Sequence, residues 1–237
     1  MYSRHARTLL ATSLFAVALT ACGAADAEPR RAETASPSTH GAPSAADSAR
    51  DALIARADLG RIKGSDSASV WLVVISDFEC PFCKRWHDET APRIDQAYVR
   101  TGKARVAYLN FPLNTHPNAQ PAHEFAMCAA EQGEFWRAAD RLFATQDLWK
   151  RRRDAAAYFD SLGVALRFDM PRLRACVGDG VLKELIAADY QRSVRIGVGS
   201  TPTFLVGDQA IIGAQPYEAF AAALDAAIAA AASRPSR

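Results

Sequence analysis

The sequence predicts an α/β fold with an inserted helical subdomain, and three observations support this fold class. A short apolar run at residues 70–76 passes directly into a helical pattern that starts with Cys80-Pro81-Phe82-Cys83. A second β-type run follows at residues 105–111, so that strand, helix and strand form one βαβ unit. About ninety residues of mostly helical spacing then separate this unit from a β-hairpin pattern at residues 203–213.

The βαβ unit is predicted from side-chain type and from proline. Residues 70–76 are short, β-branched and apolar on both faces, as in a central strand that helices cover on each side. The helix that starts at Pro81 is expected to end near Gly102, and Pro112 stops the second strand. A short edge strand at residues 61–64 and a short helix at residues 51–58 precede the unit.

The inserted subdomain is expected at about residues 116–195, where apolar side chains recur every three to four positions. Its helices are expected at residues 119–133, 134–145, 152–162, 169–177 and 181–194. Glycines are the expected breaks between them. Its aromatic side chains are predicted to form its core rather than a ligand-binding box; they are Phe125, Phe135, Trp136, Phe143 and Phe159.

The C-terminal part is predicted to be a hairpin followed by a helix. Residues 203–206 and 210–213 flank the turn Gly207-Asp208. The closing helix contains Tyr217, Phe220 and Leu224, and residues 233–237 are expected to be a disordered tail.

The N-terminal part is predicted to be an export signal followed by a tether. Residues 1–21 combine a basic start with a short apolar run. This run ends in Leu19-Thr20-Ala21-Cys22, which resembles the lipobox of bacterial lipoproteins and implies acylation of Cys22. The alternative is cleavage after Ala25-Asp26-Ala27, which releases a soluble protein. Residues 22–50 are polar and expected to be disordered, which leaves residues 51–232 as the folded domain.

Composition narrows the possible functions. The chain has 237 residues, of which 49% are hydrophobic, and a formal net charge of +2. This balance gives no basic stripe that would indicate a nucleic-acid partner. Either interpretation of the N-terminus places the mature chain outside the cytoplasm, in a compartment where disulfides can persist.

Cys80 and Cys83 are the candidate reactive residues. Cys80 is expected at the start of a helix and Pro81 at its first position, so unpaired N–H groups face an accessible Cys80 sulfur. Such a site lowers a cysteine pKa from its free value of about 8.5. Cys83 lies on the same helix face and can close a short disulfide. The alternatives are half a zinc site, although no second Cys-x-x-Cys follows, and a purely structural disulfide.

Other chemistry-bearing side chains receive structural interpretations. Cys128 and Cys176 lie on different predicted helices, and in an exported chain a structural disulfide between them is expected; two free buried cysteines are the alternative. His116 and His123 are interpreted as surface histidines rather than catalytic ones.

The motifs together resemble the DsbA-like branch of the thioredoxin superfamily over residues 60–230. The resemblance depends on Ser76-Asp77-Phe78-Glu79-Cys80-Pro81-Phe82-Cys83, on the insertion with its two cysteines, and on Gly199-Ser200-Thr201-Pro202-Thr203-Phe204. It implies a thioredoxin fold with an inserted helical subdomain and no cofactor or metal. It also implies that Pro202 is cis beside the two cysteines, and that Thr201 presents its backbone to an extended substrate segment.

One position departs from the family. Many thioredoxin-fold enzymes carry a buried carboxylate six residues before the first cysteine, and this chain has Val74 there. Proton transfer at Cys83 is then expected to use water, Asp77 or Glu79, although both carboxylates are interpreted mainly as solvated charges.

The function that the resemblance implies is thiol–disulfide exchange with exported proteins. The expected role is that of an oxidase in the bacterial cell envelope, facing the periplasm, anchored by lipid at Cys22 and served by a membrane redox partner. Residues 22–50 are too short and polar for the dimerisation domain of a disulfide isomerase. A disulfide reductase for one partner, a carrier of a soft metal and a binding module with a vestigial site are the alternatives.

Overall fold

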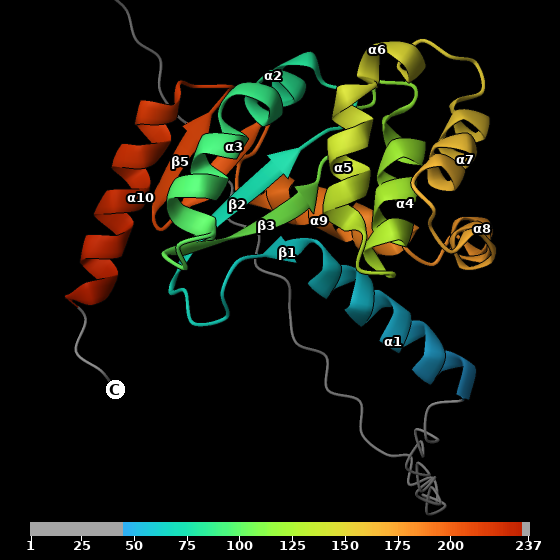
Figure 1. Ribbon diagram of the computed structural model, residues 1–237, viewed down its shortest axis with the longest axis horizontal. Coiled ribbons are helices and arrows are strands. Elements are labelled where there is room, and N and C mark those ends of the chain that lie inside the picture. The colour runs from blue at the N-terminus through green and yellow to red at the C-terminus, as the bar shows by residue number, and fades with distance from the viewer. Residues whose placement is uncertain (1–44, 234–237) are drawn as a thin grey trace, which may run out of the picture. The chain divides into compact units, whose positions relative to one another are not determined.

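The strands of the computed structural model, which describes residues 45–233, form one five-stranded sheet in the order β1-β3-β2-β4-β5 (Figure 1). Their bounds are Ile62–Lys63 for β1, Val70–Ser76 for β2, Ala104–Asn110 for β3, Thr203–Val206 for β4 and Gln209–Ile212 for β5. The central strand β2 pairs in parallel with β3 and antiparallel with β4. The predicted βαβ unit, edge strand and hairpin are therefore present.

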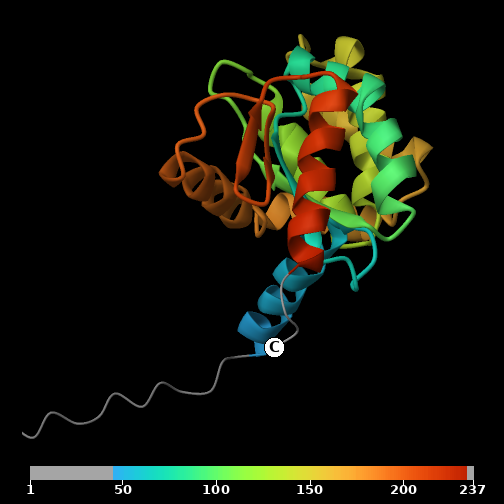
Figure 2. The ribbon, with the colours of Figure 1, turned by 90° about the vertical axis from the view of Figure 1, so that its left-hand side faces the viewer.

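Helices cover both faces of this sheet. Figure 2 shows α9 (Lys183–Arg195) on one side and α10 (Tyr217–Ala232) with α3 (Ala91–Ile94) on the other. The two faces of β2 are accordingly buried in different clusters: Leu72 and Val74 belong to the main core, whereas Ile75 packs with Phe111 and Val198. This double cover explains the continuous apolar sequence of the strand.

The helix expected to run from Pro81 to Gly102 is interrupted. Helix α2 (Pro81–Glu89) ends at Thr90, and α3 and the π-helical turn η1 (Asp95–Val99) follow. Pro92 lies in the first turn of α3, where it has no N–H to donate and its ring would clash with the carbonyl four residues earlier. A continuous, undistorted helix is therefore disfavoured at this point.

The insertion between β3 and β4 is helical, as predicted. Its helices are α4 (Ala119–Ala130), α5 (Phe135–Ala144), α6 (Gln146–Trp149), α7 (Ala155–Ala165), α8 (Met170–Asp179) and α9. The sequence does not reveal α6, because one turn of helix is too short to show a period. Four of the five named aromatic side chains are buried, and Trp136 is partly buried with the Lys63 ammonium 4.5 Å from its ring centre.

Helix α1 (Ala45–Gly60) corrects the N-terminal boundary, because residues 45–50 are helical instead of part of the tether. Packing stabilises this helix: Ala57 is fully buried, and Arg56 pairs with Glu131 at the end of α4 at 2.7 Å. Gly60 allows a close approach there, since a Cβ atom on it would lie 2.2 Å from the carbonyl oxygen of Ala130. Contacts with the rest of the domain thus stabilise α1, whose polar sequence alone did not predict a helix at residues 45–50.

Several predictions fall outside the described residues. These are the signal peptide at residues 1–21, Cys22, the tether up to residue 44 and the tail from residue 234. Among residues 45–233, no helix has both the length and the apolar run that crossing a bilayer requires.

Candidate active site

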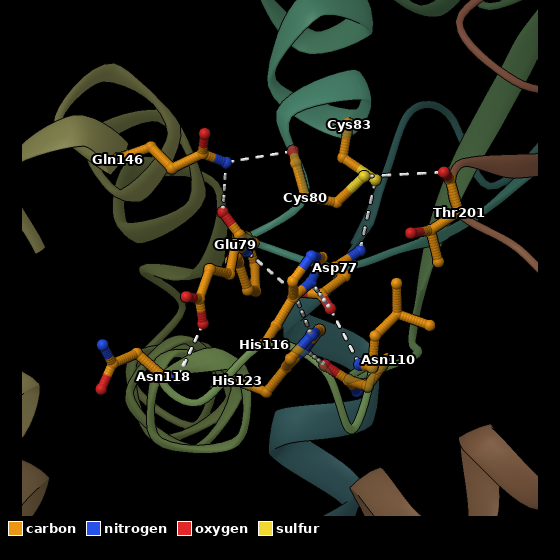
Figure 3. A network of polar contacts seen from close by, with 12 residues as sticks. Asp77, Glu79, Cys80, Cys83, Asn110, His116, Asn118, His123, Gln146 and Thr201 are labelled. Atoms are coloured by element: carbon orange, nitrogen blue, oxygen red, sulfur yellow. Dashed lines mark hydrogen bonds and ion pairs between the residues drawn. The ribbon is translucent and has the colours of Figure 1, made fainter. Parts of the chain in front are cut away.

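Cys80 lies where the buried strand β2 gives way to helix α2. It is the N-cap residue of α2, with the extended backbone angles φ −71° and ψ 125°, and Pro81 occupies the first turn. Cys83 follows on the inner face of the same turn, and both cysteines are free thiols. Figure 3 shows the two sulfur atoms side by side.

The surroundings of the two sulfurs shift their pKa values in opposite directions. Hydrogen bonds with the Cys83 thiol, with Thr201 and with the backbone N–H groups of Cys83 and Phe82 lower the pKa of Cys80 to about 6, against the effect of burial. Burial, and then the neighbouring Cys80, raise the pKa of Cys83 well above its usual value. At neutral pH the pair is therefore a thiolate at Cys80 and a thiol at Cys83.

Thr201 and Pro202 lie against this pair. The peptide bond between them is cis, and the carbonyl oxygen of Thr201 is 3.5 Å from the Cys80 sulfur. Cys80 is only 3% exposed, so the prediction of an accessible sulfur is wrong for this structure. The Thr201 backbone thus borders a nearly buried Cys80 sulfur.

Asp77 connects the loop before Cys80 to the insertion. Its carboxylate accepts hydrogen bonds from the backbone N–H groups of Glu79 and Leu113, both at 2.8 Å, and lies 2.8 Å from Nδ1 of His116. Its own N–H donates to the Cys83 sulfur at 3.5 Å. Asp77 is fully buried, so its interpretation as a solvated charge is wrong.

Glu79 and Gln146 fasten the same loop to the insertion (Figure 3). Glu79 is 6% exposed rather than solvated, and its carboxylate accepts the N–H of Asn118 at the start of α4 at 2.7 Å. Burial raises its pKa, and the hydrogen bond from Asn118 opposes this rise. The side chain of Gln146 donates to the carbonyl oxygens of Phe78 and Cys80 at 2.7 and 3.0 Å.

The two histidines near the start of the insertion lie in different environments, and the prediction of a surface histidine is wrong for His123. His123 is fully buried, its Nδ1 lies 2.7 Å from Oδ1 of Asn110, and burial lowers its pKa to about 4. His116 has a side chain that is 22% exposed, and it faces Asp77. The sequence could not identify these roles, because the partner of His116 is 39 residues away in the chain.

Val74 occupies the position where many thioredoxin-fold enzymes carry a buried carboxylate. It pairs with Tyr108 on the neighbouring strand β3. The Tyr108 ring stacks on Phe78 with ring centres 5.0 Å apart, and its buried hydroxyl has no hydrogen-bond partner of normal geometry, although the Ser76 side chain lies near it. A polar group therefore lies beside Val74, on the strand next to it.

Two further chemical predictions concern a structural disulfide and a metal site. Cys128 on α4 and Cys176 on α8 are joined by a disulfide. Within the described part of the chain, no three His, Cys, Asp or Glu side chains are arranged to hold a metal ion. The half zinc site considered from the sequence thus has no further ligands among these residues.

Comparison with known proteins gives one family match and several relatives. The model of the family described as Thioredoxin matches residues 57–226. The Na(+)/H(+) antiporter NhaA 3 of Salinispora tropica is 35% identical over 179 residues, and the probable disulfide bond formation protein D of Bacillus anthracis is 24% identical over 151 residues. These alignments cover 75% and 60% of this chain. The chain spans 26% of the length of that antiporter and 67% of the Bacillus protein.

Solved structures share the fold. Alpha-DsbA1 of Wolbachia pipientis superposes with a TM-score of 0.65 at 17% identity, over 73% of this chain and 92% of that one. Oxidised BdbD of Bacillus subtilis also gives 0.65, at 18% identity, over 72% and 94%. With a family match over most of its length and this fold, the chain belongs to the thioredoxin family and is built like its DsbA-like members.

Proposed function

We propose that this protein is a thiol–disulfide oxidoreductase of the bacterial cell envelope, which acts as an oxidase of exported proteins through Cys80 and Cys83. The observation that carries the proposal is the electrostatic asymmetry of the pair, with a stabilised thiolate at the helix start and a buried thiol next to it. The name of the Bacillus anthracis relative, a probable disulfide bond formation protein, supports the same chemistry.

The reaction has two exchange steps. A client thiolate attacks the Cys80 sulfur of the Cys80–Cys83 disulfide, and Cys83 leaves with the electron pair and takes up a proton, as its raised pKa favours. A second client thiolate then attacks the client sulfur of the mixed disulfide, and Cys80 leaves as a thiolate. The client loses two electrons and gains a disulfide, while the protein ends as the dithiol.

The lowered pKa of Cys80 supports the direction of this reaction. A thiol of lower pKa is a better leaving group, so the second step is fast. A stabilised thiolate also lowers the free energy of the dithiol form relative to the disulfide form. Both effects make the protein an oxidant rather than a reductant.

The surface around Cys80 supports the binding of extended clients. The Thr201 backbone borders the sulfur, and main-chain hydrogen bonds there would accept many sequences. Phe82, between the two cysteines, is 54% exposed and offers an apolar contact to unfolded segments.

The cell-envelope setting is also part of the proposal. The disulfide between Cys128 and Cys176 is consistent with an oxidising compartment, and Cys22 would anchor the chain by lipid beside a membrane redox partner. Incorporation of labelled palmitate into the wild type but not into Cys22→Ser would support the anchor. Equal labelling of both chains would rule it out.

The direct test of function is oxidation of a reduced, unfolded client protein by the disulfide form. Loss of client thiols is followed with a thiol reagent for the wild type, for Cys80→Ser and for the double variant C128S/C176S. We expect Cys80→Ser to be inactive and the double variant, checked by circular dichroism to be folded, to be active. Activity in Cys80→Ser would refute the proposal.

The reduction potential separates the oxidase from a reductase. We expect a value near the strongly oxidising end of the range, about −120 mV, because the Cys80 thiolate is stabilised. A potential near about −270 mV would assign the protein to the reductases instead.

A further inference from the structure

His116 is an ionisable neighbour of the reactive pair that the Cys-x-x-Cys motif does not contain. It lies in the segment between β3 and α4, and its imidazole meets the fully buried carboxylate of Asp77 at 2.8 Å. In Figure 3 the imidazole lies below Cys80, between the loop before α2 and the start of α4.

The groups that face His116 are acidic. They are Asp77 and Glu79 in the loop before α2, and Cys80 at its N-terminus. The hydrogen bond with Asp77 raises the pKa of His116 most, and the negative charges of Asp77, Glu79 and Cys80 add to the rise against burial. A buried carboxylate without a cation is costly, so the proton on His116 also stabilises the loop.

His123 shows that this behaviour is specific to the environment of His116. Both histidines come from the same part of the insertion, and His123 Nε2 lies 3.9 Å from Oδ1 of Asp77. Full burial nevertheless lowers the pKa of His123 to about 4, which leaves it neutral. The pKa values of these two imidazoles are therefore shifted in opposite directions, and only that of His116 is raised.

The motif itself brings no cation to the Cys80 sulfur. Pro81 and Phe82 stand between the two cysteines. The next basic residues are engaged elsewhere: Lys84 pairs with Asp88 at 2.7 Å, and Arg85 donates to the carbonyl oxygen of Ala214 at 3.5 Å. Hydrogen bonds with Cys83, Thr201 and backbone N–H groups lower the pKa of Cys80, and a cation that adds to them would have to come from another part of the fold.

We propose that His116, held by Asp77, is the cation that stabilises the Cys80 thiolate. This inference deepens the proposed function, because the same thiolate is the leaving group of the second exchange step. In that step Cys80 departs with the electron pair of the broken S–S bond, and His116 keeps its proton throughout. His116 is thus a positioning and electrostatic residue, not an acid that is consumed.

The first test measures the Cys80 thiolate directly, by its absorbance near 240 nm in the reduced protein as a function of pH. In His116→Gln we expect the pKa of Cys80 to rise by about one unit, which means about tenfold less thiolate well below that pKa. His116→Lys keeps a cation and should restore most of the thiolate. His87→Gln is the matched control, since His87 on α2 pairs with Asp140 at 3.1 Å, and it should leave the curve unchanged.

The second test uses reciprocity, because two interacting charges shift each other equally. Imidazole proton resonances give the pKa of His116 in the reduced wild type and in Cys80→Ser, and we expect a lower value in the variant. This measurement decides the matter even if His116→Gln does not fold. An unchanged Cys80 curve in folded His116→Gln, or an unchanged His116 pKa in Cys80→Ser, would overturn the inference.

Neither test depends on enzymatic turnover. If the wild type fails to oxidise clients but the two pKa values remain coupled, the proposed function is wrong and the electrostatic pair stands. If clients are oxidised but the coupling is absent, the function stands and the role of His116 is refuted.

Discussion

Cys80 and Cys83 lie on one turn of helix, yet the fold stabilises the thiolate of the first and destabilises that of the second. Cys80 is the N-cap residue of α2 and receives N–H groups, whereas Cys83 points into the core and is 1% exposed. Both sulfurs are buried, since Cys80 is 3% exposed, and the hydrogen bonds that Cys80 receives therefore account for much of the difference. The difference allows one sulfur to exchange bonds with clients while the other stays protonated.

The stability of the dithiol form should depend on pH through Cys80. Its folded pKa of about 6 is below the unfolded value of about 8.5, so the folded state binds fewer protons between these values. Stability should therefore fall as the pH drops through this window and level off below it. The measurement is the urea concentration at the midpoint of unfolding, for the reduced wild type and for Cys80→Ser, at pH 8 and at pH 5.5. The difference between the two proteins at each pH isolates the contribution of Cys80. A difference that does not change with pH would contradict it.

The buried hydroxyl of Tyr108 gives a second prediction at the residue scale. Because this hydroxyl has no hydrogen bond of normal geometry and only Ser76 lies near it, Tyr108→Phe removes a poorly satisfied polar group and keeps the stacked ring. We expect the free energy of unfolding to rise by about 1 kcal/mol. Tyr98→Phe is the matched control: that hydroxyl lies 2.9 Å from Asp225, and its loss should lower the free energy of unfolding. Equal losses in both variants would show that the Tyr108 hydroxyl has a partner in solution.

At the scale of elements, the insertion shapes the loop between β2 and α2. Asp77 accepts the N–H of Leu113, Glu79 accepts the N–H of Asn118, and Gln146 on α6 donates to two carbonyls of the loop. A strand-to-helix turn is thereby tied to three places in the insertion. The geometry of the reactive pair thus depends on helices that are distant in sequence.

Gln146→Ala tests this connection. Gln146 is 1% exposed and holds the carbonyl oxygens of Phe78 and Cys80, so its truncation should destabilise the protein by about 1–3 kcal/mol. The matched control is Gln209→Ala on the exposed strand β5, which should change stability by less than about 0.5 kcal/mol. Urea unfolding of both variants in the same redox state measures the two values. Equal effects would show that the contact with the loop is not energetically important.

At the scale of the whole molecule, the insertion is itself closed by a covalent bond. The disulfide between Cys128 and Cys176 joins α4 to α8 across a sequence separation of 48 residues. Helix α1 adds a second tie, since Glu131 at the end of α4 pairs with both Arg56 and Arg172. These contacts hold the insertion in one arrangement over the sheet.

Removal of this disulfide should be costly. For a loop of about 49 residues, the entropy of the unfolded chain accounts for about 4 kcal/mol, and C128S/C176S should lose that amount. Urea unfolding is compared with the wild type while Cys80 and Cys83 are kept reduced in both. A loss below about 1 kcal/mol would mean that the packing of α4 and α8 alone holds the insertion.

The sequence predicted much of the fold because the signals are local. Residues 70–76 are β-branched and apolar, Pro81 suits a helix start, and Gly207 with Asp208 marks the hairpin, where Gly207 adopts a φ of +56°. One of the two errors has a local cause, the proline at residue 92, and the other comes from contacts between distant residues. The single helix expected after Pro81 breaks at Thr90, and residues 45–50 fold because the domain provides a surface for α1.

The sequence by itself determined the reactive pair, the α/β class and the helical insertion, because periodicity and proline position act over a few residues. Only the tertiary structure decided the charges around that pair. The sequence predicts that Asp77 and Glu79 are solvated. In the fold they instead contact residues that lie 36 to 39 positions further along the chain, which are Leu113, His116 and Asn118. The reason is physical: burial and hydrogen-bond partners set the electrostatics of a side chain, and both are supplied here by other elements of the fold.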